Sequence, residues 1–223
     1  ESFPLFGYDL SDYNQLFEEK LDLLLKINNE ENVSWSGILR RPMENQTVYP
    51  RAYNEGKLPI WIAVGGTPES VLRAAKLGLP LIVAIIGGMP RQFKNLIDFY
   101  KQEYLRAGHD ESKMQIAIHS HTFVSDDQKD INQYFFNYKS QMDRIGKSRD
   151  WAPYTKEQYE GGRSEDGALF IGSANQVADK IAEMKELFGL TRFIGHMDVG
   201  DPAHDVMMKS IELFGEKVAP KVK

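Results

Sequence analysis

The sequence predicts an α/β protein with a parallel sheet, because strand and helix patterns alternate along most of its length. Three observations support this fold class: apolar runs of strand length, turns rich in glycine or proline after most of them, and amphipathic stretches of helical length after the turns. The runs lack the polar alternation of a half-exposed strand, and helices between strands favour parallel pairing. Four such units in series fit either a doubly wound sheet or part of a (β/α) barrel.

Residues 1–57 show a different pattern. Residues 11–28 are predicted to form a helix, since apolar residues recur at helical spacing and Ser11 or Asp12 can cap its start. The helical period stops there. Residues 28–57 carry several turn-forming glycines and prolines, which predict a short hairpin or an irregular excursion.

The strand and helix units follow from residue 58. The apolar runs and their helices are 58–64 with 68–77, 79–86 with 91–107, 115–124 with 126–146, and 192–199 with 202–217. A further helix is predicted at 174–188, after the N-cap residue Ser173. Residues 147–168 interrupt this order as a long polar insertion, which is typical of a functional lid or a disordered loop.

The composition narrows the possible functions. The chain has 223 residues, a formal net charge of −5 and no cysteine, so it holds no disulfide, no cysteine-ligated metal and no thiol nucleophile. Its cations are not clustered, which favours a small-molecule ligand over nucleic acid. The apolar runs are far shorter than the ~20 residues of a membrane helix, and no signal peptide is recognisable. We therefore expect a cytoplasmic protein that does not enter a membrane.

The first glycine-rich turn is the most informative candidate site. Gly65 and Gly66 end a predicted buried strand, and Thr67 and Pro68 open the next helix. Backbone N–H groups at such a turn, together with the partial positive charge of a helix amino end, can bind a phosphate. A tight βα turn without a ligand explains the same residues equally well. The pair Gly87 and Gly88 repeats the arrangement, and turn formation alone accounts for it.

Two other segments carry candidate ligand groups. Gly172 and Ser173 could bind an anion at a helix start or form an ordinary cap. His119 and His121 are two residues apart on a predicted strand, so they point to the same face, and His196 on the last strand could join them. These histidines could contact a ligand or transfer protons, or they could be hydrogen-bonded structural residues. Their spacing matches no known metal motif, so no metal is expected.

The aromatic Trp151 lies in the polar insertion, where an exposed indole is easier to explain by a ligand or partner than by packing. No serine–histidine–aspartate order and no paired-carboxylate spacing is recognisable in the sequence. The residues by themselves therefore indicate an α/β protein that binds a phosphate-bearing ligand.

Three separated segments, residues 58–70, residues 167–181 and residues 210–220, resemble the bacterial luciferase-like flavin-dependent monooxygenases. The resemblance implies a single domain over residues 1–223 with a (β/α)8 TIM-barrel fold, of which this chain holds about the C-terminal half, strands 5 to 8. It also implies reduced FMN as cofactor, favoured over a deazaflavin. The implied cofactor-binding residues are Ala63, Gly65, Gly66, Thr67, Gly87 and Gly88, and the implied catalytic residues are His119 and His121.

The resemblance further implies an oxidoreductase that uses reduced FMN, supplied by a separate flavin reductase, and O₂ to oxygenate a small organic substrate. A homodimer is expected. Two alternatives stay open: a non-catalytic flavin-binding protein, and a truncated half-barrel that self-associates. Because four strands leave unpaired edges, we expect the encoded protein to be longer than this chain.

Overall fold

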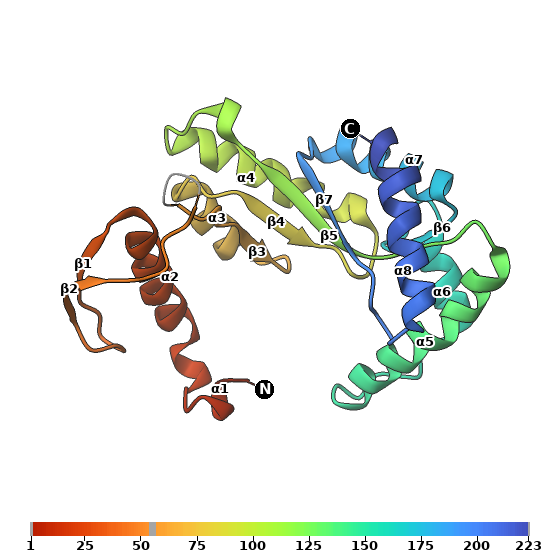
Figure 1. The fold of residues 1–223 in the computed structure, drawn as a ribbon, viewed down its shortest axis with the longest axis horizontal. Coiled ribbons are helices and arrows are strands. Elements are labelled where there is room, and N and C mark those ends of the chain that lie inside the picture. Colours follow the sequence, from red (N-terminus) through yellow and green to blue (C-terminus); the bar gives the residue numbers. More distant parts are fainter. Residues whose placement is uncertain (1, 54–56, 223) are drawn as a thin grey trace. The chain divides into compact units, whose positions relative to one another are not determined.

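The computed structural model describes residues 2–53 and 57–222. The chain forms two compact units, Glu1–Ile60 and Trp61–Lys223. Each unit is described by itself (Figure 1).

The first unit combines one long helix with a two-stranded hairpin. Helix α2 (Tyr13–Asn29) confirms the expected helix, and β1 (Asn32–Trp35) pairs antiparallel with β2 (Met43–Thr47), which confirms the hairpin. The small core includes Val33 and the ring of Trp35, whose Nε1 donates a 2.7 Å hydrogen bond to an aspartate of α2. Two short helical segments precede α2: α1 (Ser2–Leu5) and a 3-10 turn (Leu10–Asp12).

The second unit is built on a five-stranded parallel sheet (Figure 1). The strands are β3 (Ile62–Val64), β4 (Leu81–Ala84), β5 (Ile116–Val124), β6 (Phe170–Gly172) and β7 (Arg192–His196). The helices are α3 (Pro68–Lys76), α4 (Lys94–Arg106), α5 (Gln128–Lys147), α6 (Lys156–Arg163), α7 (Ala174–Phe188) and α8 (His204–Leu213). Short helical turns cover Pro90–Phe93, Glu111–Lys113, Phe214–Val218 and Ala219–Lys221.

Strand β5 organises the sheet. It pairs with β4 and β7 through its first residues and with β6 through its last three. Its nine residues make it longer than any other described strand, and it is bordered by β4 and β7 in Figure 1. Among the described residues the sheet is open, with β3 at one end of the order.

The two faces of the sheet differ in composition. Residues paired across parallel strands share a face, so the registers place Val64, Val83 and Ile118 in one row, with at most 4% of each side chain exposed. Helix α3 packs behind β3 and β4. The opposite face carries a mixed set that includes the three histidines: Ala63, Ile82, Ala84, Ala117, His119, His121, Arg192, Ile194 and His196. In a closed barrel this second face would line the interior.

Two expectations about the sheet require correction. The sheet has five described strands, where the sequence predicts four. The additional strand is β6, which was not predicted because a run of three residues is too short to show the pattern of a strand. The predicted strand 58–64 is also shorter, since β3 begins at Ile62, after Pro59, which lacks the N–H that a strand ladder uses.

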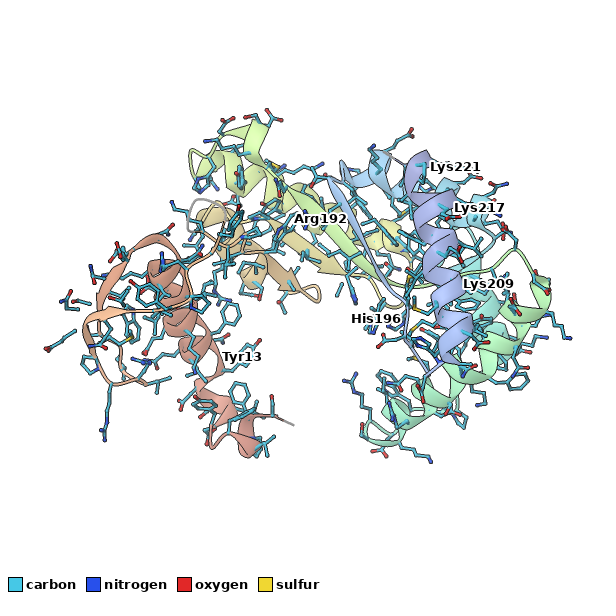
Figure 2. The ribbon with its side chains drawn as sticks, in the orientation of Figure 1. Tyr13, Arg192, His196, Lys209, Lys217 and Lys221 are labelled. Carbon is cyan, nitrogen blue, oxygen red and sulfur yellow. The ribbon has the colours of Figure 1, made fainter. Side chains whose placement is uncertain are left out.

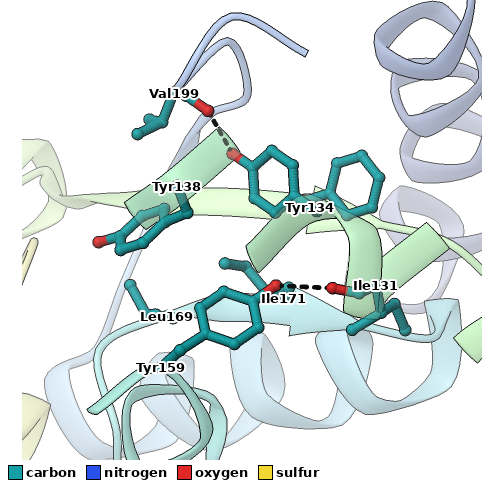
Figure 3. Close-up of a cluster of buried hydrophobic side chains, with 8 residues drawn as sticks. Ile131, Tyr134, Tyr138, Tyr159, Leu169, Ile171 and Val199 are labelled. Carbon is teal, nitrogen blue, oxygen red and sulfur yellow. Dashed lines mark hydrogen bonds between the residues drawn. The ribbon is translucent and has the colours of Figure 1, made fainter. Parts of the chain in front are cut away.

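The insertion 147–168 is not a structureless loop. It contains α6, which begins with a capping box between Thr155 and Gln158. Tyr159 anchors the helix: its ring is fully buried and its hydroxyl donates a 3.0 Å hydrogen bond to the Ile131 carbonyl of α5 (Figure 3). The insertion is therefore attached to the core through an aromatic side chain.

An aromatic cluster joins α5, α6 and the end of β5. Tyr134 stacks on Phe123 at a centroid distance of 4.2 Å, and its hydroxyl donates to the Val199 carbonyl at 2.9 Å (Figure 3). Tyr138 and Tyr159 complete the cluster, with ring centroids 5.9 Å apart. The cluster fixes the segment after β7 against α5.

The carboxyl-terminal helical segment is attached to the loop after β5. Lys217 Nζ lies 2.7 Å from Asp126 Oδ2, and the buried Ser210 hydroxyl accepts a 2.7 Å hydrogen bond from the Val124 N–H. Figure 2 shows Lys209, Lys217 and Lys221 along this segment.

Candidate functional site

A large cleft lies beyond the carboxyl ends of the strands in the second unit. Its volume is about 1740 Å³, and its walls come from the segments after β4, β5 and β7, from α5 and α6, and from the loops on both sides of α6. The carboxyl ends of parallel strands are the usual location of ligand sites in barrels and open α/β sheets. The position and size of the cleft make it the candidate ligand site.

Three histidines meet at one edge of this cleft. The rings of His119 and His121 lie 5.2 and 5.3 Å from the ring of His196. The register explains the meeting, because β5 and β7 place His121 directly opposite His196. His196 lies at the carboxyl end of β7 (Figure 2). His121 and His196 line the cleft, whereas His119 lies behind His196, away from the lining.

Each of the two lining histidines has a polar partner. His196 Nε2 lies 2.8 Å from Asp198 Oδ1, and His121 Nδ1 lies 2.9 Å from the Tyr138 hydroxyl. A carboxylate only accepts hydrogen bonds, so the His196 ring proton sits on Nε2 and its Nδ1 is left as the acceptor. The aspartate thus fixes the tautomer of His196 in the way that a carboxylate orients a catalytic histidine.

Burial keeps the inner histidines neutral. Desolvation, with smaller contributions from His196 and His119, lowers the pKa of His121 to about 4. Desolvation and His196 also lower the pKa of His119. Burial raises the pKa of the Tyr138 phenol well above its ordinary value, so this hydroxyl keeps its proton. At neutral pH the inner part of the cluster therefore carries no charge.

Acidification is expected to destabilise the folded chain between about pH 6.5 and pH 4. His121 has an ordinary pKa of 6.5 in the unfolded state and about 4 in the folded state. The unfolded chain therefore binds a proton first as the pH falls, so the stability from neutral His121 is complete above pH 6.5 and lost by pH 4. This shift corresponds to a loss of at most about 3 kcal/mol.

Urea unfolding at several pH values measures this loss. In His121→Gln the free energy of unfolding is expected to change less with pH than in the wild-type chain. His204→Gln removes an exposed histidine of the same cleft and should leave the pH dependence unchanged. Equal slopes for the wild-type chain and His121→Gln would contradict the assignment.

The first glycine turn lies apart from the cleft. Ala63 of β3 and the residues Gly65, Gly66 and Thr67 after it are exposed, and none of them lines the cleft. Gly66 has φ +131°, which requires glycine, and a Cβ added at Gly65 would meet no atom within 4 Å. The backbone here is open to a ligand.

The amino end of α3 fits an oxyanion. Thr67 is its N-cap, but its side chain makes no capping hydrogen bond; its hydroxyl donates instead to the Ser70 hydroxyl at 3.0 Å. The first-turn N–H groups of Glu69 and Ser70 thus have no side-chain cap, and they lie at the positive end of the helix dipole. A phosphate would supply the missing acceptors.

The other two candidate turns behave differently. Ser173 caps α7 itself: its hydroxyl accepts from the Gln176 N–H, and the Gln176 side chain accepts from the Ser173 N–H, so the capping alternative is confirmed. Gly87 and Gly88 line the cleft, beside His121. The structure thus separates the expected site residues into the Gly65–Thr67 turn and the cleft.

Several cleft residues were not singled out from the sequence. Tyr138 and Asp198 hold the histidines, and Arg144 and Arg149 line the wall beside Trp151. Asp198 could have been found, because it follows His196 by two residues. Tyr138 had no sequence signal beyond the apolar spacing of its helix.

Two further properties concern the described residues as a whole. Within residues 2–53 and 57–222, no group of three or more histidine, aspartate or glutamate side chains is arranged to hold a metal ion. No helix in these ranges has the length and apolar character required to cross a membrane.

The fold and the cleft define an α/β protein of the barrel type with a ligand site at the carboxyl ends of its strands. The luciferase-like monooxygenase family model matches residues 1–191. Since this covers most of the chain, the protein belongs to the luciferase-like monooxygenase family.

Individual relatives are distant. An uncharacterized protein, y4vJ of Sinorhizobium fredii, is 25% identical over 230 residues, which cover 99% of this chain and 65% of that protein. The monooxygenase RslO1 from Streptomyces bottropensis is similar in structure, with a TM-score of 0.81 and 18% identity over 100% of this chain and 65% of that chain. The chain therefore spans slightly less than two thirds of the length of these relatives.

Two other similar structures differ in their cofactors. The oxygenating constituent of 3,6-diketocamphane monooxygenase from Pseudomonas putida, in complex with FMN, has a TM-score of 0.57 and 22% identity over 94% of this chain and 63% of that chain. The coenzyme F420 dependent tetrahydromethanopterin reductase from Methanopyrus kandleri has a TM-score of 0.63 and 16% identity over 93% and 63%. At these identities the likeness shows the fold.

Proposed function

We propose that this protein is a flavin-dependent monooxygenase that uses reduced FMN and O₂ to oxygenate a small organic substrate. The observation that carries the proposal is the uncapped amino end of α3 behind Gly65 and Gly66, an oxyanion site on a chain of this family. A separate flavin reductase would supply the reduced cofactor, and the expected assembly is a homodimer.

The chain's residues would bind the cofactor, orient the substrate and handle protons. Gly65, Gly66 and Thr67 would hold the FMN phosphate through backbone N–H groups. Bound reduced FMN supplies the two electrons by which one atom of O₂ enters the substrate and the other leaves as water. The cleft walls would limit the access of bulk water to this chemistry.

His196 is the residue best prepared to move a proton. Its Nε2 proton is held by Asp198, so Nδ1 is free to accept a proton. His121 and His119 contact its ring, and burial lowers the pKa of both. The Nδ1 atom of His121 is paired with the Tyr138 hydroxyl, so its Nε2 is the atom that would contact a ligand in the cleft. The catalytic roles of His119 and His121 are thus part of the proposal, with His196 added.

Flavin titration tests the proposal. FMN is expected to bind at least about 10-fold more tightly than riboflavin, because only FMN carries the phosphate. Substrate-dependent O₂ uptake with chemically reduced FMN then tests turnover. Equal binding of the two flavins would overturn the phosphate site, and FMN binding without turnover on a panel of aldehydes, alkanes and sulfonates would identify a flavin-binding protein. Titration with F420 decides between FMN and a deazaflavin.

A further inference from the structure

We infer that the cleft receives an organic substrate whose apolar body ends in an oxyanion, and that Arg149 and Arg144 bind this oxyanion. That the ligand is a substrate depends on the proposed function, whereas the oxyanion site depends only on the residues of the cleft. The argument depends on which charges in the cleft are already paired.

Two guanidinium groups line the cleft without a carboxylate partner. Arg144 lies in the last turn of α5 and donates only to the Gln141 side chain. The Arg149 guanidinium lies 5.1 Å from the ring centroid of Trp151. Within the described ranges, no carboxylate approaches either group within 4.0 Å. Their charge is therefore available to a ligand.

Two cations near the cleft arginines are paired with acids. Lys139 Nζ lies 2.7 Å from a carboxylate oxygen of Asp143, the residue before Arg144. Arg163 of α6 is likewise 2.8 Å from Glu160. The two cleft arginines differ from these residues because they line the cleft without an acidic partner among the described residues, so a ligand in the cleft can supply one.

The acids of the cleft do not neutralise the arginines. Asp166 is paired with Arg91 at 3.4 Å, and Asp198 is paired with His196 at 2.8 Å. Asp201 is the one lining carboxylate for which the described residues show no cationic partner. Asp198 and Asp201 both line the cleft, but among the described residues neither carboxylate lies within ion-pair distance of Arg144 or Arg149, so the two guanidinium groups remain open to a ligand.

The loop that carries Arg149 is fixed at both ends. The Trp151 N–H donates to the Gly146 carbonyl at 3.0 Å, and the Tyr154 N–H donates to Asp143 at 2.7 Å. The indole of Trp151 is 56% exposed and lines the cleft. Arg149 stacked on an anchored indole is ready to form paired hydrogen bonds to a planar or tetrahedral oxyanion.

The rest of the wall suits an apolar substrate body. Met142, Ile145, Leu169 and Met207 line the same cleft. An oxyanion could also come from the flavin phosphate, but the turn proposed to hold that phosphate lies outside this cleft. The substrate is therefore the source of the oxyanion that we assign to Arg149 and Arg144.

Octanoate and 1-octanol distinguish an oxyanion from an equally long neutral ligand. Binding to the flavin-free chain is followed by tryptophan fluorescence, with Trp151→Phe identifying the signal. Octanoate is expected to bind about 10-fold more tightly than 1-octanol. Arg149→Gln should weaken octanoate binding by about the same factor and leave 1-octanol binding unchanged. Adding Arg144→Gln should remove any remaining preference for octanoate over 1-octanol.

Lys147→Gln is the matched control, because it removes one exposed positive charge from the same end of α5 but does not line the cleft. It should change octanoate binding less than twofold. Equal affinity for octanoate and 1-octanol, or equal losses in Arg149→Gln and Lys147→Gln, would overturn the inference. So would an Arg149→Gln variant that loses the preference for FMN over riboflavin instead, since the oxyanion would then be the flavin phosphate.

The inference and the proposed function fail in different ways. Octanoate selectivity without FMN binding would support the oxyanion site and reject the flavin-dependent function. Selective FMN binding without octanoate selectivity would support the flavin-dependent function and reject the oxyanion site. Circular dichroism confirms that each variant is folded before binding is interpreted.

Discussion

Thr67→Asp is expected to stabilise the folded chain and at the same time to remove selective binding of FMN. The Thr67 side chain now makes no capping hydrogen bond, although its φ of −80° and ψ of 123° suit an N-cap. An aspartate there would accept from the first-turn N–H groups and interact with the helix dipole, which adds about 0.5–1 kcal/mol to the free energy of unfolding. The same carboxylate would occupy the phosphate's donors and repel the phosphate.

Two measurements on Thr67→Asp therefore move in opposite directions. Chemical unfolding should show higher stability, and flavin titration should show FMN weakened about 10-fold or more with riboflavin nearly unchanged. Thr67→Ser, which keeps a hydroxyl at the N-cap, is the control and should preserve the preference for FMN. If Thr67→Asp is more stable but binds FMN as before, the phosphate is held elsewhere.

Tyr159→Ala is expected to cause a large loss of stability, about 3–5 kcal/mol. The ring is fully buried between α5 and α6, 5.4 Å from Phe135 and 5.9 Å from Tyr138 in centroid distance. Its removal leaves a cavity and detaches α6, so the wall of the cleft should loosen as well.

The conservative variant separates packing from hydrogen bonding. Tyr159→Phe keeps the ring and loses only the hydrogen bond to the Ile131 carbonyl, so the expected cost is about 1 kcal/mol. Urea unfolding gives both values, and hydrogen exchange of α6 amides should increase more in the alanine variant. A loss under about 1.5 kcal/mol for Tyr159→Ala would show that α6 is not anchored by this ring.

The sequence was sufficient for the parts of the fold that depend on periodicity. Alternation along one strand placed His119 and His121 on the same face, and pairing with the last strand brought His196 to them. The amphipathic stretches likewise located the helices, since their apolar faces repeat over several turns.

The parts that were missed depend on packing between distant segments or on very short elements. Tyr138 reaches His121 only because α5 lies against the end of β5, a relation that no local spacing contains. The three residues of β6 are too few for a pattern. The start of α6 could have been predicted from the sequence, since Thr155 and Gln158 form a capping box. It was not predicted because the surrounding insertion is polar and was interpreted as a loop.

The different compositions of the two sheet faces have a consequence for genetic variation. On β3 and β4, Val64 and Val83 are nearly buried, while the alternate residues Ala63 and Ala84 lie on the other face. When every residue of these strands is substituted in turn, the folded protein should tolerate substitutions at alternate positions: few at the buried positions and more at the positions between them. Substitutions can accumulate in one set of codons while the set that holds the core stays constant, so the two faces of one strand can change almost independently.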